Sequence, residues 1–106
     1  MSYELKVNAS GKYHFNLKAR NGQVILSSES YEAKPSALAG IESVRVNGKA
    51  DSNFERKVSS AKEPYFVLKA QNGQVIGRSE MYSSEAARDN GIASVQENCS
   101  STTIAE

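Results

Sequence analysis

The sequence predicts an α+β fold built by duplication, in which two tandem copies of one unit of antiparallel strands and a helix are related by a pseudo-two-fold axis. Residues 3–47 align with residues 54–98 at a constant offset of 51, and 20 of the 45 aligned positions are identical. Each copy shows the period of two that is typical of strands, followed by the spacing of three and four that is typical of a helix. Because so short a copy holds a marginal core alone, we expect the two to share one core.

Two half-buried strands are predicted at the start of the first copy. Apolar and polar residues alternate over residues 3–7 and again over residues 13–19, which is the pattern of a strand with one face on the core. The intervening residues 8–12, Asn-Ala-Ser-Gly-Lys, predict a hairpin loop. The second copy repeats these features, so we expect an equivalent hairpin there.

The Asn-Gly pair at residues 21–22 predicts a tight turn into a third strand. Asn-Gly favours a two-residue type I′ turn, because both central residues then take a positive φ. Such a turn sets the register by placing Leu17 opposite Leu26 and Lys18 opposite Ile25. We therefore expect Leu17 and Leu26 on the apolar face, and Lys18 and Ile25 side by side on the opposite face.

The second copy departs from the first at two strand positions. Arg56 replaces Leu5, and Gly77 replaces Leu26, so two core side chains are lost. These substitutions predict that the second half of the sheet is less deeply covered. The long Arg56 stem can still lie over apolar neighbours while its guanidinium stays in water.

A helix is predicted to follow each set of strands. In the first copy, Pro35 suits the first helical turn. Backbone N–H groups in that turn have no acceptor within the helix, so proline, which has no N–H group, loses no hydrogen bond there. In the second copy, Ser83 is the predicted N-cap. We expect the two helices to continue to about Asn47 and Asn98.

One glycine in each predicted helix leaves two interpretations open. Gly40 and Gly91 would suit a C-cap that ends the helix. Against this, Ala37, Ile41 and Val44 follow the i, i+4, i+7 spacing of a helix that continues through the glycine. We favour continuation, with each glycine allowing close approach to the sheet, since a mid-helix glycine costs about 1 kcal/mol relative to alanine.

The predicted organisation is one domain over residues 1–106. It contains the two repeats, 3–47 and 54–98, joined by a linker over residues 48–53. Residues 99–106 form either a short final strand or a frayed tail.

Composition narrows the functional classes. Thirteen basic and twelve acidic side chains give a net charge of +1, which disfavours nucleic acid and anionic membranes as partners. No apolar run approaches the roughly 18 residues of a membrane span, so we expect no membrane association. The start of the sequence shows no secretory signal, and Cys99, the one cysteine, has no partner for an internal disulfide. We therefore expect a cytoplasmic protein.

The repeated motifs resemble those of the YegP-like family of small uncharacterised bacterial proteins. They are Phe-x-Leu-Lys-Ala-x-Asn-Gly-Gln-Val-Ile at 15–25 and 66–76, Ser-Glu-x-Tyr at 28–31 and 79–82, and Ala-Ala-Arg-Asp-Asn-Gly-Ile at 86–92. The resemblance implies two βββαβ units in a single sheet, with the last strands exchanged between units. It implies no activity, cofactor or catalytic residue. The chain looks like a tandem form that carries its partner covalently, so we expect a monomer.

The inventory of reactive side chains argues against a metal, cofactor or catalytic site. His14 is the one histidine, and together with Cys99 it matches no zinc-binding spacing. A nucleophilic triad would need His14, which lies on the polar face of a predicted strand and is replaced by Tyr65 in the other copy. We therefore expect no catalytic, cofactor-binding or metal-binding residues, and read His14 as an ordinary surface histidine.

The outer face of the sheet is the predicted site of partner binding. If no helix covers it, that face carries a mixed apolar and basic surface that is repeated in both copies. Contiguous exposed apolar surface is typical of a binding site, whereas scattered apolar residues are ordinary. The candidate residues are Lys18, Ile25, Lys69, Ile76, Tyr65 and Val67.

The sequence leaves three functional interpretations. The first is a non-enzymatic binding module that uses the outer face to hold an unidentified protein partner. The alternative is a structural or stress-associated protein without a small ligand, because a fold alone does not specify function. The third is an enzyme with an acid-base site at Glu29 and Tyr31 and at Glu80 and Tyr82, although acids near a helix start also have a purely structural role.

Overall fold

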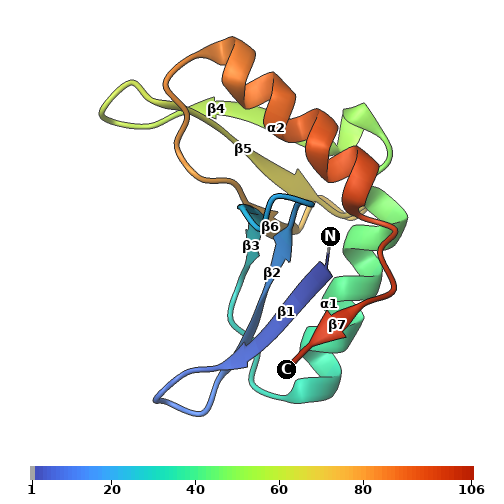
Figure 1. Cartoon of the computed structure of the whole chain (residues 1–106). Coiled ribbons are helices and arrows are strands. Elements are labelled where there is room, and N and C mark those ends of the chain that lie inside the picture. Colours follow the sequence, from blue (N-terminus) through green and yellow to red (C-terminus); the bar gives the residue numbers. More distant parts are fainter. Residues whose placement is uncertain (1) are drawn as a thin grey trace.

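The computed structural model describes residues 2–106 and confirms the predicted α+β fold with two tandem repeats (Figure 1). The strands are β1 (Ser2–Val7), β2 (Tyr13–Lys18), β3 (Val24–Ser28), β4 (Phe54–Val58), β5 (Pro64–Lys69), β6 (Val75–Arg78) and β7 (Ile104–Ala105). The helices are α1 (Lys34–Asn47) and α2 (Glu85–Asn98), and a 3₁₀ turn, η1 (Asp51–Asn53), lies between α1 and β4. The seven strands form one sheet in the order β4-β5-β6-β3-β2-β1-β7, and both helices lie on the same side of it.

The two repeats join where β3 pairs with β6. This pairing is antiparallel, through Ser27 opposite Arg78 and Ser28 opposite Gly77, and it merges two three-stranded units into one sheet. The helices reach across the junction, because α1 contacts β5 and β6 of the second repeat and α2 contacts β2 and β3 of the first. The core is therefore shared between the copies, as their short length requires.

The last residues settle the choice between a strand and a tail. Ile104 and Ala105 form β7, which pairs parallel with Tyr3 and Glu4 of β1. The Tyr3 N–H group donates a hydrogen bond to the Thr103 carbonyl oxygen at 2.9 Å, so β7 adds a strand beside the first one. In the first repeat, the corresponding residues form η1 and lead directly into β4. Among the described residues, only the second repeat therefore has a separate final strand.

The predicted type I′ turn is wrong. The Gly22 N–H group donates to the Ala19 carbonyl at 3.0 Å, and the Ala19 N–H group donates to the Gln23 carbonyl at 2.9 Å, so the loop has three residues. Gly22 has a φ of 83°, whereas Asn21 does not take a positive φ. The Asn21 side chain instead accepts a hydrogen bond from the Gln23 N–H group at 2.9 Å. This is a type I turn followed by a left-handed glycine.

The longer turn changes the register of the hairpin. Leu17 lies opposite Leu26 as predicted, but Lys18 lies opposite Val24, with an irregularity between the two pairs. Ile25 is the extra residue, and both Ile25 and Leu26 are buried in the core, with exposed fractions of 5% and 1%. The predicted position of Ile25 on the outer face, beside Lys18, is therefore wrong, because a bulge turns successive side chains away from strict alternation.

Both helices continue through their glycines to Asn47 and Asn98, as predicted. A Cβ atom on Gly40 would collide with the Tyr31 hydroxyl group and would lie 2.9 Å from the Phe15 ring. The glycine therefore permits the close approach that the sequence suggested. Pro35 lies in the first turn of α1, also as predicted.

The start of α2 differs from the prediction by one residue. The N-cap is Ser84 and not Ser83, since the Ser84 hydroxyl oxygen accepts a hydrogen bond from the Ala87 N–H group at 3.1 Å. Either serine can cap a helix through its hydroxyl, so the residue type alone could not choose between neighbours. Within residues 2–106, neither helix has the length and hydropathy of a membrane span.

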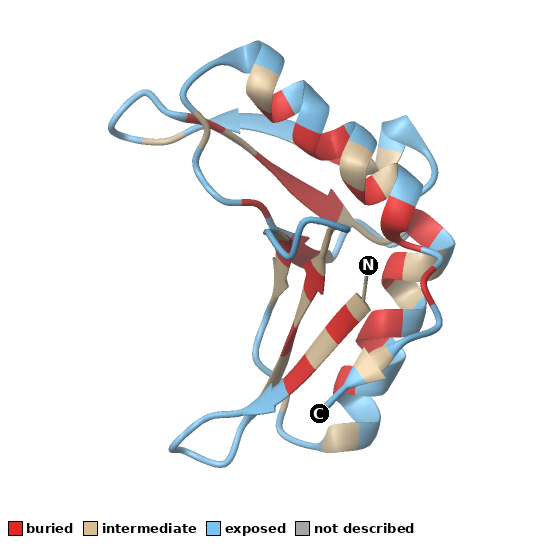
Figure 2. Ribbon diagram, in the orientation of Figure 1, coloured by how far each residue is buried: buried red, intermediate tan, exposed pale blue. Residues whose placement is uncertain are grey.

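The core lies between the sheet and the helices, where the buried positions of both face each other (Figure 2). Phe15 packs edge-to-face against Tyr3 and stacks on Tyr31, with ring centroids 6.0 and 6.2 Å apart. Phe66 repeats this arrangement with Phe54 and Tyr82. Burial of each large aromatic side chain contributes about 2–3 kcal/mol, so these two clusters are major sources of stability.

The substitution of Arg56 for Leu5 has a local explanation. Leu5 is buried, whereas Arg56 is exposed on the edge strand β4. Its guanidinium group forms ion pairs with Asp51 at 3.2 Å and with Asp89 of α2 at 3.1 Å. Charged side chains on an edge strand also discourage pairing with strands of other molecules.

Candidate functional site

The face of the sheet opposite the helices, here called the open face, is covered by no other element of residues 2–106. Its ends carry matching charged clusters. In the first repeat, the Glu4 carboxylate lies between the Lys18 and Lys6 amino groups, at 3.2 and 3.5 Å. Hydrogen bonding from Lys18 is the main cause that lowers the pKa of Glu4. Glu4 therefore stays ionised in mildly acidic solution and fixes both lysines along the strands.

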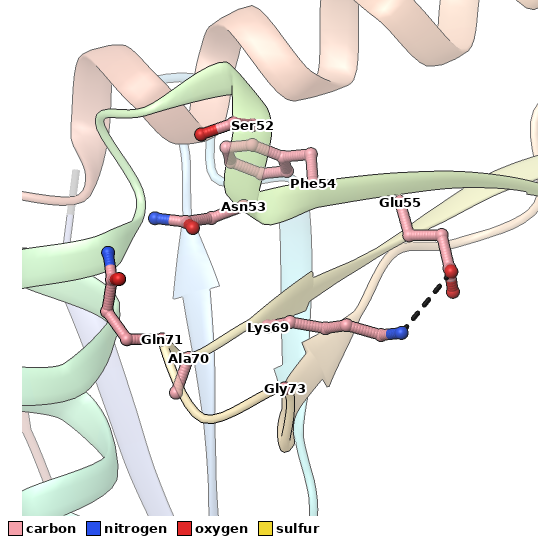
Figure 3. A pocket seen from close by; sticks show the side chains of 8 residues that line it. All are labelled: Ser52, Asn53, Phe54, Glu55, Lys69, Ala70, Gln71 and Gly73. Atoms are coloured by element: carbon pink, nitrogen blue, oxygen red, sulfur yellow. Dashed lines mark hydrogen bonds and ion pairs between the residues drawn. The ribbon is translucent and has the colours of Figure 1, made fainter.

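The second repeat has the same arrangement. The Glu55 carboxylate lies 3.2 Å from the amino groups of both Lys57 and Lys69, and hydrogen bonds from Lys57 and then Lys69 lower the pKa of Glu55. Figure 3 shows Lys69 reaching across the neighbouring strand to Glu55. The two residues border a hollow of about 370 Å³ between the start of β4 and the β5–β6 turn.

The open face carries more basic than acidic residues. Strand residues alternate between faces, and the pairing register places five basic and two acidic side chains here, a net charge of +3 against +1 for the whole chain. The basic residues are Lys6, Lys18, Lys57, Lys69 and Arg78, and the acidic residues are Glu4 and Glu55. The positive charge of the chain is thus concentrated on one side.

Four of the six predicted partner-binding residues lie on the open face. Lys18 and Lys69 belong to the two charged clusters described above. Val67 lies between Glu55 and Arg78 on its neighbouring strands and is 5% exposed, while Tyr65 lies opposite Lys57. The face is therefore mainly polar and basic.

The other two predicted residues, Ile25 and Ile76, are buried in the core, so the prediction that they form an exposed apolar surface is wrong. Each instead borders a pocket between the repeats. Ile76 lines a pocket of about 410 Å³ beside α1, and Ile25 lines one of about 250 Å³ beside α2. We call these the α1 pocket and the α2 pocket.

The two pockets are built from equivalent residues of opposite repeats. In each, the turn and third strand of one repeat face a tyrosine and a helical serine of the other. Six equivalent pairs line both pockets, and every pair is identical in residue type. They are Ala19 and Ala70, Asn21 and Asn72, Gln23 and Gln74, Ile25 and Ile76, Tyr31 and Tyr82, and Ser43 and Ser94.

Sequence reasoning missed these pockets. Their signal was present, because Gln23 and Gln74 are identical although the turn needs no particular side chain there. The identity of Ser43 and Ser94 was equally visible in the alignment. Only the pairing of β3 with β6 brings the turn of one repeat to the helix of the other.

Glu29 and Tyr31, which sequence reasoning considered as an acid-base pair, both line the α1 pocket. Burial and then the charge of Glu29 raise the pKa of Tyr31, and burial and then Glu80 raise that of Tyr82. Both hydroxyl groups are therefore protonated at neutral pH. A tyrosine acting as a general base needs the opposite shift, so this arrangement favours hydrogen bonding over proton abstraction.

The remaining reactive side chains do not converge. His14 lies on β2 opposite Lys6, on the open face. Cys99 is fully buried at the end of α2, and burial raises the pKa of its thiol, which lowers its reactivity. Within residues 2–106, no group of three or more possible metal ligands occurs.

A family described as Domain of unknown function (DUF1508) matches the chain twice, over residues 8–55 and 59–106. Among curated relatives, the UPF0339 protein YegP of Yersinia pestis is 58% identical over 102 residues, covering 96% of this chain and 91% of that protein. A UPF0339 protein of Mannheimia succiniciproducens is 54% identical over 102 residues, with coverage of 96% and 90%.

Two solution NMR structures are similar to this one. A UPF0339 protein of Shewanella oneidensis has a TM-score of 0.91 at 51% sequence identity, with 97% of this chain and 87% of that chain covered. The protein of unknown function yegP from E. coli has a TM-score of 0.92 at 45% identity, with coverage of 97% and 89%. The relatives and these structures share the whole fold and bear names that state no activity.

Proposed function

The chain belongs to the DUF1508 family, whose description states no function. We propose that it is a non-enzymatic interaction module that binds an acidic protein surface through its open face. Membership also confirms the YegP-like resemblance seen in the sequence. The observation that carries the proposal is the separation of faces. Both helices cover one side of the sheet, while the other side is uncovered and has a net charge of +3.

The arrangement of charges supports a folded partner. The Lys-Glu-Lys clusters hold their amino groups in fixed positions at both ends of the sheet, and such patterns confer specificity and faster association on complementary surfaces. Single-stranded nucleic acid usually stacks its bases on several aromatic side chains. Tyr65 is the one phenylalanine or tyrosine that the register of the described strands places on the open face.

We also propose that the protein acts as a monomer in the cytoplasm. The β3–β6 pairing already joins two equivalent units within one chain. An enzymatic role has less support, because Tyr31 and Tyr82 are protonated and the other reactive side chains of the described residues do not cluster.

The open face can be tested by removing charge at matched positions. In the variant K18Q/K69Q, two lysines of the open face lose their charge. In the control K12Q/K62Q, two lysines of hairpin loops lose theirs, so the net charge changes equally. Immobilised full-length protein is used to capture partners from nuclease-treated native lysate, and bound proteins are identified and measured at increasing salt concentration.

The expected result is that the original chain and K12Q/K62Q retain the same acidic proteins, that salt releases them, and that K18Q/K69Q loses them. Retention of the same proteins by K18Q/K69Q contradicts the proposal. Retention that occurs in a parallel capture from untreated lysate, but not from nuclease-treated lysate, would assign the face to nucleic acid and would also contradict it. Thermal unfolding of all three proteins establishes that the substitutions leave the fold intact.

A further inference from the structure

The α1 and α2 pockets contain polar groups that have no partner within the protein. Among residues 2–106, no hydrogen bond is formed by the Tyr31 hydroxyl group or by the side-chain amide of Gln74, and the Glu29 carboxylate forms neither a hydrogen bond nor an ion pair. All three residues line the α1 pocket. Polar groups at the mouth of a pocket are available to a ligand when the protein does not use them itself.

The turn at the edge of the pocket is rigid. The Asn72 side-chain oxygen accepts a hydrogen bond from the Gln74 N–H group at 3.0 Å, and Gly73 takes the left-handed conformation that the turn needs, with a φ of 83°. Ile76 is 5% exposed and provides an apolar base. The pocket therefore combines a fixed apolar floor with hydrogen-bonding groups at its rim, which is the usual composition of a small-molecule site.

The charge of the pocket selects the type of ligand. No lysine, arginine or histidine is among the residues that line the α1 pocket, and Glu29 is its one ionisable acid. Glu29 and Tyr31 both line this pocket, so one ligand can reach the two side chains together. The α2 pocket differs, because Glu80 is not among the residues that line it. The Glu29 carboxylate disfavours an anionic ligand in the α1 pocket.

We infer that the α1 pocket binds a small ligand that carries a primary ammonium group on a short apolar chain. The Glu29 carboxylate balances the charge, and the Tyr31 hydroxyl oxygen and the Gln74 side-chain carbonyl oxygen accept hydrogen bonds from the ammonium group. The apolar chain lies on Ile76. This pocket lies between the repeats, so the inference does not depend on the open face.

The test uses three probes of the same size and different charge: n-butylammonium, butyrate and 1-butanol. Each is titrated into the ¹⁵N-labelled full-length protein at constant ionic strength, and backbone amide shifts are followed by NMR. We expect n-butylammonium to shift resonances of residues 29–31 and 72–74 with saturation, and to shift those of residues 80–82 and 21–23 less at the same concentration. Butyrate should leave them unchanged, and 1-butanol should bind about fivefold more weakly, the effect of one partly exposed charge contact.

The α2 pocket, which lacks a lining carboxylate, serves as the control. E29Q should weaken n-butylammonium binding about fivefold in the α1 pocket, whereas E80Q should leave that binding unchanged. Equal binding of n-butylammonium and 1-butanol in the α1 pocket would overturn the inference. So would unchanged binding in E29Q, or shifts of similar size at exposed acids away from the pockets, such as Glu32 and Glu63. K18Q/K69Q should bind n-butylammonium normally, so this inference and the open-face proposal can fail separately.

Discussion

Leu26 and Gly77 occupy equivalent positions in the two repeats and lie against each other where β3 meets β6. A Cβ atom on Gly77 would lie 3.2 Å from Leu26 Cγ and 2.6 Å from the Ser27 carbonyl oxygen. The same site therefore holds a large side chain from one copy and no side chain from the other. Two leucines would compete for one space.

Gly48 and Cys99 form a second pair of this kind. They are equivalent residues at the ends of α1 and α2, and a Cβ atom on Gly48 would lie 2.9 Å from the Cβ atom of Cys99. Equivalent residues meet each other only near a two-fold axis. Both pairs therefore mark the pseudo-two-fold axis, and at both the duplicated sequences have diverged into one large and one small residue.

The first prediction concerns an exchange of Leu26 and Gly77. Leu26→Gly removes a buried side chain and should cost at least about 2–5 kcal/mol in the free energy of unfolding. Gly77→Leu overfills the same space and should cost at least about 1–3 kcal/mol. The combined variant L26G/G77L should be more stable than the sum of these losses predicts, because it restores one large and one small residue. Urea denaturation of the four proteins measures the coupling.

A coupling energy below about 0.5 kcal/mol would show that the two sites act independently and would contradict this account. The substitutions Ala19→Gly and Ala70→Gly, measured singly and together, give a suitable control. These residues are also equivalent, but they line separate pockets, so their effects should add.

The second prediction concerns Gly40. Alanine is favoured over glycine in a helix by about 1 kcal/mol, yet we expect Gly40→Ala to destabilise the protein by about 1–3 kcal/mol. The reason is that the added methyl group collides with the Tyr31 hydroxyl group and with Phe15. In a Tyr31→Phe background the loss should be smaller. Thermal and urea unfolding measure it, and an equal loss in both backgrounds would rule out the hydroxyl contact as the cause.

The third prediction concerns acid. The lysine contacts lower the pKa of Glu4 and Glu55 below their ordinary value of 4.5. Folding therefore gains stability from these carboxylates above about pH 4.5, and this gain is lost as the pH falls through their lower pKa in the folded state. The variant E4Q/E55Q should show a shallower loss of stability between about pH 5 and pH 2.

Urea denaturation across this pH range provides the measurement. Identical slopes for E4Q/E55Q and the original chain would mean that the charged clusters do not contribute to the acid response. Because the ion pairs are exposed, added salt should reduce the difference between the two proteins.

The fourth prediction concerns alkali. Tyr3 is fully buried and its hydroxyl group donates a hydrogen bond to the Cys99 carbonyl oxygen at 2.5 Å. Burial raises the pKa of Tyr3 above its ordinary value of 10.0. The neutral phenol thus contributes stability that is fully present below about pH 10 and is lost as the pH rises toward the pKa of the folded state.

Tyr3→Phe should cost about 0.5–1.5 kcal/mol at neutral pH, because the hydrogen bond is lost, and should flatten the alkaline decline. The absorbance of ionised Tyr3 is obtained by subtracting the alkaline titration of Tyr3→Phe from that of the original chain. It should appear only at the pH at which the original chain unfolds. Ionisation of Tyr3 near pH 10 in a chain that remains folded would contradict the assignment.

Much of the fold could be predicted because local patterns determine it. The alternation over residues 3–7 and 13–19 predicted strands, and the apolar spacing around Gly40 correctly predicted a helix that continues to Asn47. These periods depend on which side chains face the core, so they survive in a single sequence. The internal repeat then predicted the second half of the fold from the first.

The candidate site was harder to predict because small local choices control it. The Asn21 side chain stabilises a three-residue turn, and the bulge that follows moves Ile25 from the open face into the core. Neither feature alters the hydrophobic pattern that identified the hairpin. The pockets also bring together residues that lie far apart in the sequence, such as Tyr31 and Gln74, which are 43 positions apart and share no local pattern.

The pairing of β7 with β1 has a consequence for synthesis of the chain. Tyr3 receives its backbone acceptor, the Thr103 carbonyl, and its side-chain acceptor, the Cys99 carbonyl, from residues made about a hundred positions later. β1 is therefore synthesised well before the residues that complete its hydrogen bonds. Until then its outer edge has no partner strand, and the charged residues Glu4 and Lys6 next to Tyr3 and Leu5 oppose pairing of that edge with other chains.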